Sequence, residues 1–85
     1  MHSVVIYTKS TCPYCLAAKA LLRRKGVPFE EISVDGDRVA QMAMAAKAGG
    51  RSTVPQIFVG GAHVGGCDDL HDLDAAGELD GVLAN

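Results

Sequence analysis

The fold is decided by residues 3–26, which read SVVIYTKSTCPYCLAAKALLRRKG. Residues 3–8 are mostly β-branched or aromatic and contain no breaker, which predicts a strand. Apolar residues then recur at helical spacing, which predicts a helix over 13–25. The residues at this spacing are Ala17, Ala18, Leu21 and Leu22. Two cysteines, Cys12 and Cys15, lie where the loop after the strand enters the helix.

The patterns beyond residue 26 extend this strand and helix into a larger sheet. A strand over 28–34 completes a βαβ unit, and a helix over 38–48 follows it. Strands over 56–59 and 62–64 are separated by two glycines, which is typical of a tight hairpin. An acidic helix and a last short helix around 79–83 end the chain. A βαβ unit followed by ββα predicts an α/β protein of the thioredoxin-like fold, with a four-stranded mixed sheet and helices on both faces.

Length and composition indicate one domain that spans residues 1–85. The chain is 48% hydrophobic and 21% charged, which supplies enough apolar surface for a core. No apolar run approaches the roughly 18 residues of a membrane span, and the N-terminus lacks the basic region of a secretory leader. Three cysteines are too few for a disulfide scaffold. We therefore expect a cytoplasmic monomer without a membrane partner.

The charge is divided unevenly between the two halves of the chain. Residues 1–51 hold eight basic and four acidic residues, a charge of +4, whereas residues 52–85 hold six acidic and no basic residues, a charge of −6. A nucleic-acid-binding domain normally shows a basic excess with interleaved aromatic residues. Here aromatic residues make up 5% and the pI is about 5.8, so nucleic acid is excluded as a partner.

The spacing of Cys12 and Cys15 favours redox chemistry. An attacking sulfur must be a thiolate, whereas a free cysteine has a pKa of about 8.5. Pro13 suits the first position of a helix, which places Cys12 at the N-cap, where free N–H groups and the helix dipole stabilise negative charge. Lys9 would add a nearby cation. Cys15 lies nearly one turn inside the helix, so we expect Cys12 to be the catalytic nucleophile and Cys15 to resolve the mixed disulfide.

Four short motifs, spread over most of the chain, together resemble the glutaredoxin family, and within it the bacterial class of about this length. These motifs are Thr8-Lys9, Cys12-Pro13-Tyr14-Cys15, Thr53-Val54-Pro55 and Gly65-Gly66-Cys67-Asp68-Asp69. The resemblance implies a glutathione-dependent oxidoreductase that reduces protein–glutathione mixed disulfides and protein disulfides. Glutathione would be its co-substrate, and no metal is expected.

The same resemblance implies where glutathione binds. It makes the bond before Pro55 cis, so that the Val54 backbone pairs with the cysteine of glutathione like a short strand. The N–H groups near Cys67 and Asp68 would hold the γ-glutamyl carboxylate, and the Asp68 side chain its ammonium. The expected glutathione-binding residues are Lys9, Tyr14, Thr53, Val54, Pro55, Cys67 and Asp68. The resemblance implies Lys9 as the partner of the glycyl carboxylate, with Arg51 as a weaker candidate, and the pattern leaves a role for Arg38 undecided.

Three alternatives stay open at this point. Cys12 and Cys15 could form half of a zinc site with Cys67 and His71, which are four residues apart on a helix. The chain could instead be an iron–sulfur module that uses Cys12 and glutathione, although Pro13 stiffens the loop between the thiols. A glutaredoxin-like redoxin reduced by thioredoxin reductase is the third. The Cys67 thiol either fills a small apolar site, which we favour, or reacts with oxidants or glutathione.

Overall fold

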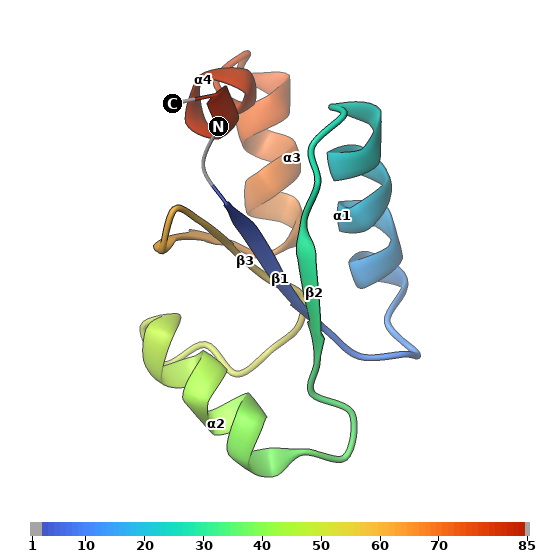
Figure 1. Ribbon diagram of the computed structural model, residues 1–85, viewed down its shortest axis with the longest axis vertical. Coiled ribbons are helices and arrows are strands. Elements are labelled where there is room, and N and C mark those ends of the chain that lie inside the picture. Colours follow the sequence, from blue (N-terminus) through green and yellow to red (C-terminus); the bar gives the residue numbers. More distant parts are fainter. Residues whose placement is uncertain (1–2, 85) are drawn as a thin grey trace.

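The computed structural model describes residues 3–84 and contains a four-stranded sheet in the order β2-β1-β3-β4 (Figure 1). The strands are β1 (Val4–Thr8), β2 (Glu30–Ser33), β3 (Gln56–Val59) and β4 (Ala62–Gly65). β1 pairs in parallel with β2 and antiparallel with β3, and β3 pairs antiparallel with β4. The sheet is therefore mixed, as predicted, and the strand that leads to Cys12 lies in its interior.

Helices cover both faces of the sheet, which confirms the predicted thioredoxin-like architecture. They are α1 (Pro13–Arg24), α2 (Arg38–Lys47), α3 (Cys67–Ala75) and α4 (Leu79–Ala84). α1 and α3 lie side by side on one face, and α2 lies on the other (Figure 1). Each face has its own cluster of buried side chains, one beneath α1, α3 and α4 and one beneath α2. Within residues 3–84, no helix has the length and apolar character needed to cross a bilayer.

The helix α1 is held on the sheet by a narrow apolar stripe. Ala18, Leu21 and Leu22 are at most 1% exposed, and each buried leucine stabilises the fold by about 1.5–3 kcal/mol. Ala17, which the apolar spacing assigned to this stripe, is instead exposed, because it points away from the sheet one residue before Ala18. Gly26 follows the helix with φ of 69°, a left-handed conformation that ends the helix.

The hairpin between β3 and β4 forms as the two glycines predict. Gly60 and Gly61 have φ of 58° and 84°, as a two-residue turn with the twist of the strands requires. The strand β4 continues one residue beyond the predicted end, to Gly65. In contrast, β2 is shorter than the predicted 28–34. This hairpin delivers the chain to the start of α3, next to the N-terminus of α1.

Candidate active site

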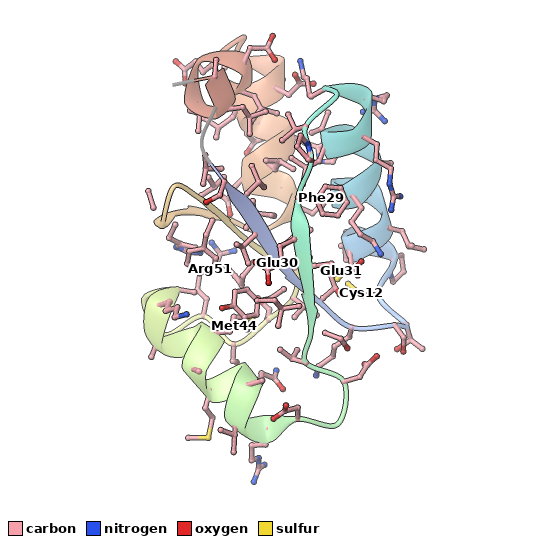
Figure 2. The ribbon with its side chains drawn as sticks, in the orientation of Figure 1. Cys12, Phe29, Glu30, Glu31, Met44 and Arg51 are labelled. Carbon is pink, nitrogen blue, oxygen red and sulfur yellow. The ribbon has the colours of Figure 1, made fainter. Side chains whose placement is uncertain are left out.

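Cys12 is the N-cap residue of α1, as its spacing from Pro13 predicts (Figure 2). Pro13 occupies the first turn, where a missing N–H leaves nothing unpaired. The Cys12 Sγ accepts a hydrogen bond from the Cys15 N–H at 3.1 Å, and its S–H faces the Val54 carbonyl oxygen at 3.7 Å. The half-buried sulfur thus meets the positive end of a helix, an environment suited to a sulfur that carries negative charge during exchange.

Cys15 lies one turn behind in a different environment. Its side chain is 1% exposed, and burial, together with the hydrogen bond to Cys12, raises the pKa of its thiol to about 12. A hydrogen bond from the Lys9 backbone and the charge of Lys19 act in the opposite direction. Cys15 is therefore a thiol at neutral pH. Both cysteines are unbonded, so the structure represents the reduced state.

A cavity of about 150 Å³ lies beside this pair. The residues that line it are Tyr14, Arg51, Thr53, Val54, Pro55, Gly66, Cys67 and Asp68. They come from the start of α1, from the loop before β3 and from the start of α3. The Val54–Pro55 bond is cis, as the resemblance implies. The cavity therefore brings together every residue that we expected to bind glutathione except Lys9, and it adds Arg51 and Gly66.

The other basic residues considered from the sequence lie elsewhere. Lys9 does not line the cavity and lies close enough to Asp35 for its charge to help lower the pKa of that carboxyl, which hydrogen bonds from Ser10 lower most. Arg38 begins α2, is exposed and does not line the cavity either. Arg51, the weaker candidate from the sequence, is thus the basic residue that the structure places at the cavity.

The buried Gln56 anchors one wall of the cavity. Its side chain is fully buried, and its Nε2 donates to the Thr53 carbonyl oxygen at 3.0 Å and lies 3.3 Å from the Thr53 Oγ1. Its Oε1 lies 2.6 Å from the His63 Nε2 on β4, so His63 is the donor in this contact. Sequence reasoning missed both residues. The available signal was a glutamine that opens an otherwise apolar strand directly after Pro55.

The opposite wall is fixed by a capping interaction at α3. The Asp69 Oδ2 accepts hydrogen bonds from the Gly66 N–H at 2.9 Å and from the Arg51 guanidinium at 3.0 Å. These two donors hold the pKa of the Asp69 carboxyl below its usual range. From the sequence, Gly66 is expected only to form a turn before the helix, and Asp69 is part of a family motif without a role of its own. The signal was present, because an acidic residue three positions after an N-cap is one half of a capping box.

Cys67 fills a nearly closed site at the start of α3. It is 8% exposed and belongs to the core beneath α1 and α3, and burial first, then the charge of Asp68, raises the pKa of its thiol. Its Sγ lies 3.4 Å from the His71 Nδ1, which also donates to the Cys67 carbonyl oxygen at 2.9 Å. Across residues 3–84, no three His, Cys, Asp or Glu side chains gather where they could hold a metal ion.

The two thiols are thus suited to successive steps of disulfide exchange. The half-buried sulfur of Cys12 can form a mixed disulfide, and the buried side chain of Cys15 lies within hydrogen-bonding distance of that sulfur. On a thioredoxin-like sheet with a cis-proline loop beside the cysteines, this arrangement defines a thiol–disulfide oxidoreductase.

Comparison with known proteins gives the family. The model of the glutaredoxin family matches residues 4–64. Glutaredoxin 3 of Escherichia coli is 57% identical over 83 residues, which cover 98% of this chain and 99% of that protein. The chain belongs to the glutaredoxin family.

Solved structures agree with this placement. The solution structure of glutaredoxin from Brucella melitensis is 51% identical, with a TM-score of 0.86 over 98% of this chain and 89% of that one. The crystal structure of a buckwheat glutaredoxin–glutathione complex is 31% identical, with a TM-score of 0.88 over 98% of this chain and 77% of that one. The fold predicted from the order of strands and helices is therefore confirmed.

Proposed function

We propose that Cys12 is the nucleophile, and Cys15 the resolving thiol, of this glutathione-dependent thiol–disulfide oxidoreductase. Membership of the glutaredoxin family carries the activity. The observation that supports the assignment of roles is the contrast between the two cysteines. Cys12 is half-buried at a helix N-cap, whereas Cys15 is 1% exposed and its pKa is raised to about 12.

On protein–glutathione mixed disulfides, Cys12 alone suffices. The Cys12 thiolate attacks the glutathione sulfur, the bond between glutathione and the protein breaks, and the protein sulfur leaves as a thiolate that takes up a proton. A second glutathione then attacks the glutathione sulfur bound to Cys12. Glutathione disulfide leaves and the reduced Cys12 returns, so that one glutathione is oxidised, one protein thiol is formed, and the glutathione of the substrate departs in the disulfide.

On protein disulfides, Cys15 completes the reaction. Cys12 first forms a mixed disulfide with one substrate sulfur, and Cys15 then attacks Cys12 to release the substrate as a dithiol. Two glutathione molecules reduce the resulting Cys12–Cys15 disulfide. The hydrogen bond from the Cys15 N–H to the Cys12 Sγ supports this role, because it keeps the two residues adjacent.

We propose that glutathione occupies the cavity beside Cys12. The Val54 backbone would pair with its cysteine, and the N–H groups at the start of α3, near Cys67 and Asp68, would hold the γ-glutamyl carboxylate. The Asp68 side chain would take the ammonium. Arg51 is the better-placed partner for the glycyl carboxylate, because it lines the cavity and Lys9 does not. The buckwheat glutaredoxin, solved as a complex with glutathione, supports glutathione as the ligand.

A glutathione-coupled assay on a small glutathione mixed disulfide tests these roles. Cys15→Ser should keep most of the activity, and Cys12→Ser should lose it. Equal losses in both variants would overturn the assignment. If glutathione fails to reduce the oxidised protein and a flavoenzyme reductase succeeds, the assignment of glutathione as the electron donor is wrong.

The glutathione site needs a separate variant and a matched control. Asp68→Asn should raise the KM for glutathione with little change in kcat, because the lost charge lies away from the reacting sulfurs. Asp72→Asn removes the same charge from an exposed position further along α3 that does not line the cavity. An equal rise of KM in both variants would point to a general charge effect and against a contact at Asp68.

We further propose that the protein acts as a cytoplasmic monomer on glutathionylated or disulfide-bonded proteins. The sequence supports this proposal, because three cysteines are too few for the disulfide scaffold that is typical of small secreted domains. Gel filtration at the protein concentration of the assay tests whether the protein is a monomer.

A further inference from the structure

A partly buried ion pair lies next to Cys15. Lys19 follows Cys15 by four residues on α1, so the two side chains share one face of the helix. The Lys19 ammonium lies 2.9 Å from the Glu31 Oε2, and its side chain is only 14% exposed. A lysine on a helix surface normally extends its ammonium into water. Here the ammonium is instead held against the sheet.

The strand β2 supplies the carboxylate. Glu31 pairs with Ile6 in the parallel ladder between β1 and β2. Successive side chains of a strand point to opposite faces, and Figure 2 shows Glu31 on the α1 side of β2 and Glu30 on the other. The neighbouring Glu30 is therefore a natural control for the charge of Glu31.

A buried hydroxyl fixes the position of this carboxylate. The Thr8 Oγ1, on a residue that is 2% exposed, donates to the same Glu31 Oε2 at 2.7 Å. This hydrogen bond first, and then Lys19, lowers the pKa of Glu31 below its usual range, so the carboxylate stays ionised at neutral pH. Thr8 also precedes the loop that carries Cys12. The chain of contacts thus runs from the active-site loop through Glu31 to Lys19.

The charges that act on Cys15 indicate a function for the ion pair between Lys19 and Glu31. Burial and the neighbouring Cys12 oppose ionisation of Cys15, whereas the charge of Lys19 favours it. Around Glu31, Arg23 is a second cation that favours the ionised carboxylate.

We propose that Glu31 is a positioning residue that holds the Lys19 ammonium where its charge assists the deprotonation of Cys15 in the resolving step. The inference rests on the proposed role of Cys15. In this step the Cys15 S–H loses its proton, its sulfur bonds to the Cys12 Sγ, and the bond between Cys12 and the substrate sulfur breaks. The substrate sulfur leaves with the electron pair and takes up a proton. Cys12 and Cys15 become a disulfide, and the substrate is reduced.

The expected size of the effect follows from thiol reactivity. A rise of one unit in the pKa of Cys15 lowers its thiolate fraction about tenfold, and the greater nucleophilicity of the more basic sulfur restores part of the rate. With a Brønsted slope of about 0.4–0.5, the net loss is about three- to fourfold per unit. Reduction of a glutathione mixed disulfide by Cys12 alone does not use Cys15. The Lys19–Glu31 ion pair should therefore affect the reduction of protein disulfides, which uses Cys15. It should leave the reduction of glutathione mixed disulfides by Cys12 unchanged.

The decisive experiment follows one turnover inside the protein. Cys12 is converted to its mixed disulfide with glutathione, excess glutathione is removed, and the release of glutathione by Cys15 is timed by mass spectrometry from pH 6 to 10. Glu31→Gln and Lys19→Gln should each slow this release at least threefold at pH 7 and displace its pH profile to higher pH. Lys19→Arg should restore most of the rate, and Glu30→Gln should leave it unchanged.

The steady-state assay on a small glutathione mixed disulfide separates the two proposals. If wild type and all variants keep the same activity there while the release rate falls in Glu31→Gln, the positioning role stands. An unchanged release rate and pH profile in Glu31→Gln and Lys19→Gln overturn it, and so does an equal loss in Glu30→Gln. Absence of glutathione-dependent activity in the wild type would overturn the proposed function instead.

Discussion

The Asp69 carboxylate and the Arg51 guanidinium lie 3.0 Å apart and join the two segments that face each other across the cavity beside Cys12. Arg51 begins the loop that continues to the cis-proline, and Asp69 lies in the first turn of α3. The same carboxylate oxygen also accepts the Gly66 N–H at 2.9 Å. One side chain therefore ties the start of a helix to the opposite wall.

Asp69→Asn should weaken this tie, because the amide oxygen can still accept the Gly66 N–H but the ion pair with Arg51 is lost. Both side chains are nearly half exposed, so we expect a loss of at most about 1 kcal/mol in the free energy of unfolding. We also expect a rise of a few fold in the KM for glutathione, because the walls of the cavity are less firmly held.

The pH dependence of that loss has a definite sign. The pKa of Asp69 is lower in the folded protein than its ordinary value of about 3.9. The stabilisation is therefore fully present above about pH 4 and is lost as the pH falls through the folded-state pKa. Urea unfolding of wild type and Asp69→Asn should differ at pH 7 and converge in acid. A difference that persists unchanged at pH 2 would show that charge is not its cause.

Gly65→Ala should be more destabilising than an alanine at another glycine of the same hairpin. Gly65 has φ of 126°, and a Cβ there would overlap the Asp69 carboxylate. Gly61 also has a positive φ, of 84°, but a Cβ would meet nothing within 4 Å. Gly61→Ala thus reports the cost of a positive φ in open space, about 1–2 kcal/mol, and the part of the Gly65→Ala loss that Asp69→Ala relieves reports the overlap. Thermal unfolding of Gly61→Ala, of Gly65→Ala and of Gly65→Ala combined with Asp69→Ala measures the cost of this overlap. No relief in the double variant would contradict the overlap.

Regular elements and the cysteine pair were predictable because local chemistry determines them. The strand and helix of residues 3–26 follow from apolar periodicity, and Pro13 at the first turn is enough to place Cys12 at the N-cap. The prediction failed where burial depends on which way a side chain faces. Ala17 fits a helical apolar pattern but is exposed, since the sheet contacts only the stripe that contains Ala18.

The parts of the site that depend on distant pairs were not predictable from spacing. Arg51 and Asp69 are 18 residues apart and meet only because β3, β4 and their turn return the chain to the cavity. The Glu31–Lys19 pair depends on the register of β2 against β1, which a single sequence does not reveal. Lys9 is near Cys12 in sequence, yet it does not line the cavity.

Cys15 should resist alkylation until strongly alkaline pH. Burial first, and then the hydrogen bond to Cys12, raises its pKa to about 12, and Cys12→Ser removes the neighbouring thiol while most of the burial is kept. At pH 8.5, where a free cysteine is half ionised, iodoacetamide should modify Cys15 of folded Cys12→Ser at least tenfold more slowly than in urea. Peptide mapping distinguishes Cys15 from Cys67. Comparable rates in the two states would contradict the burial effect.

The same raised pKa makes stability depend on alkaline pH. A thiol that keeps its proton longer in the folded state stabilises the fold below the unfolded pKa of about 8.5, and this contribution is lost as the pH rises toward 12. Wild type should therefore lose stability faster than Cys15→Ala between pH 8.5 and 10. Parallel pH profiles in urea unfolding would mean that Cys15 does not titrate differently in the two states.

Gln56→Met tests whether the buried amide holds the cis-proline loop in place. Methionine keeps the length of the side chain but removes the contacts with Thr53 and His63. Thr53 and His63 are exposed, so water can replace the lost hydrogen bonds, and we expect the free energy of unfolding to fall by only about 0.5–1.5 kcal/mol. We also expect a rise in the KM for glutathione larger than the fall in kcat. His63→Phe is the matched control, since an aromatic ring can still pack against Phe58 while only the outer hydrogen bond is lost. Because the bonds to Thr53 survive in that variant, its KM should stay near the wild-type value. An equal rise in the KM for glutathione in both variants would mean that the contact between Gln56 and His63 positions the loop, and that the contact between Gln56 and Thr53 does not.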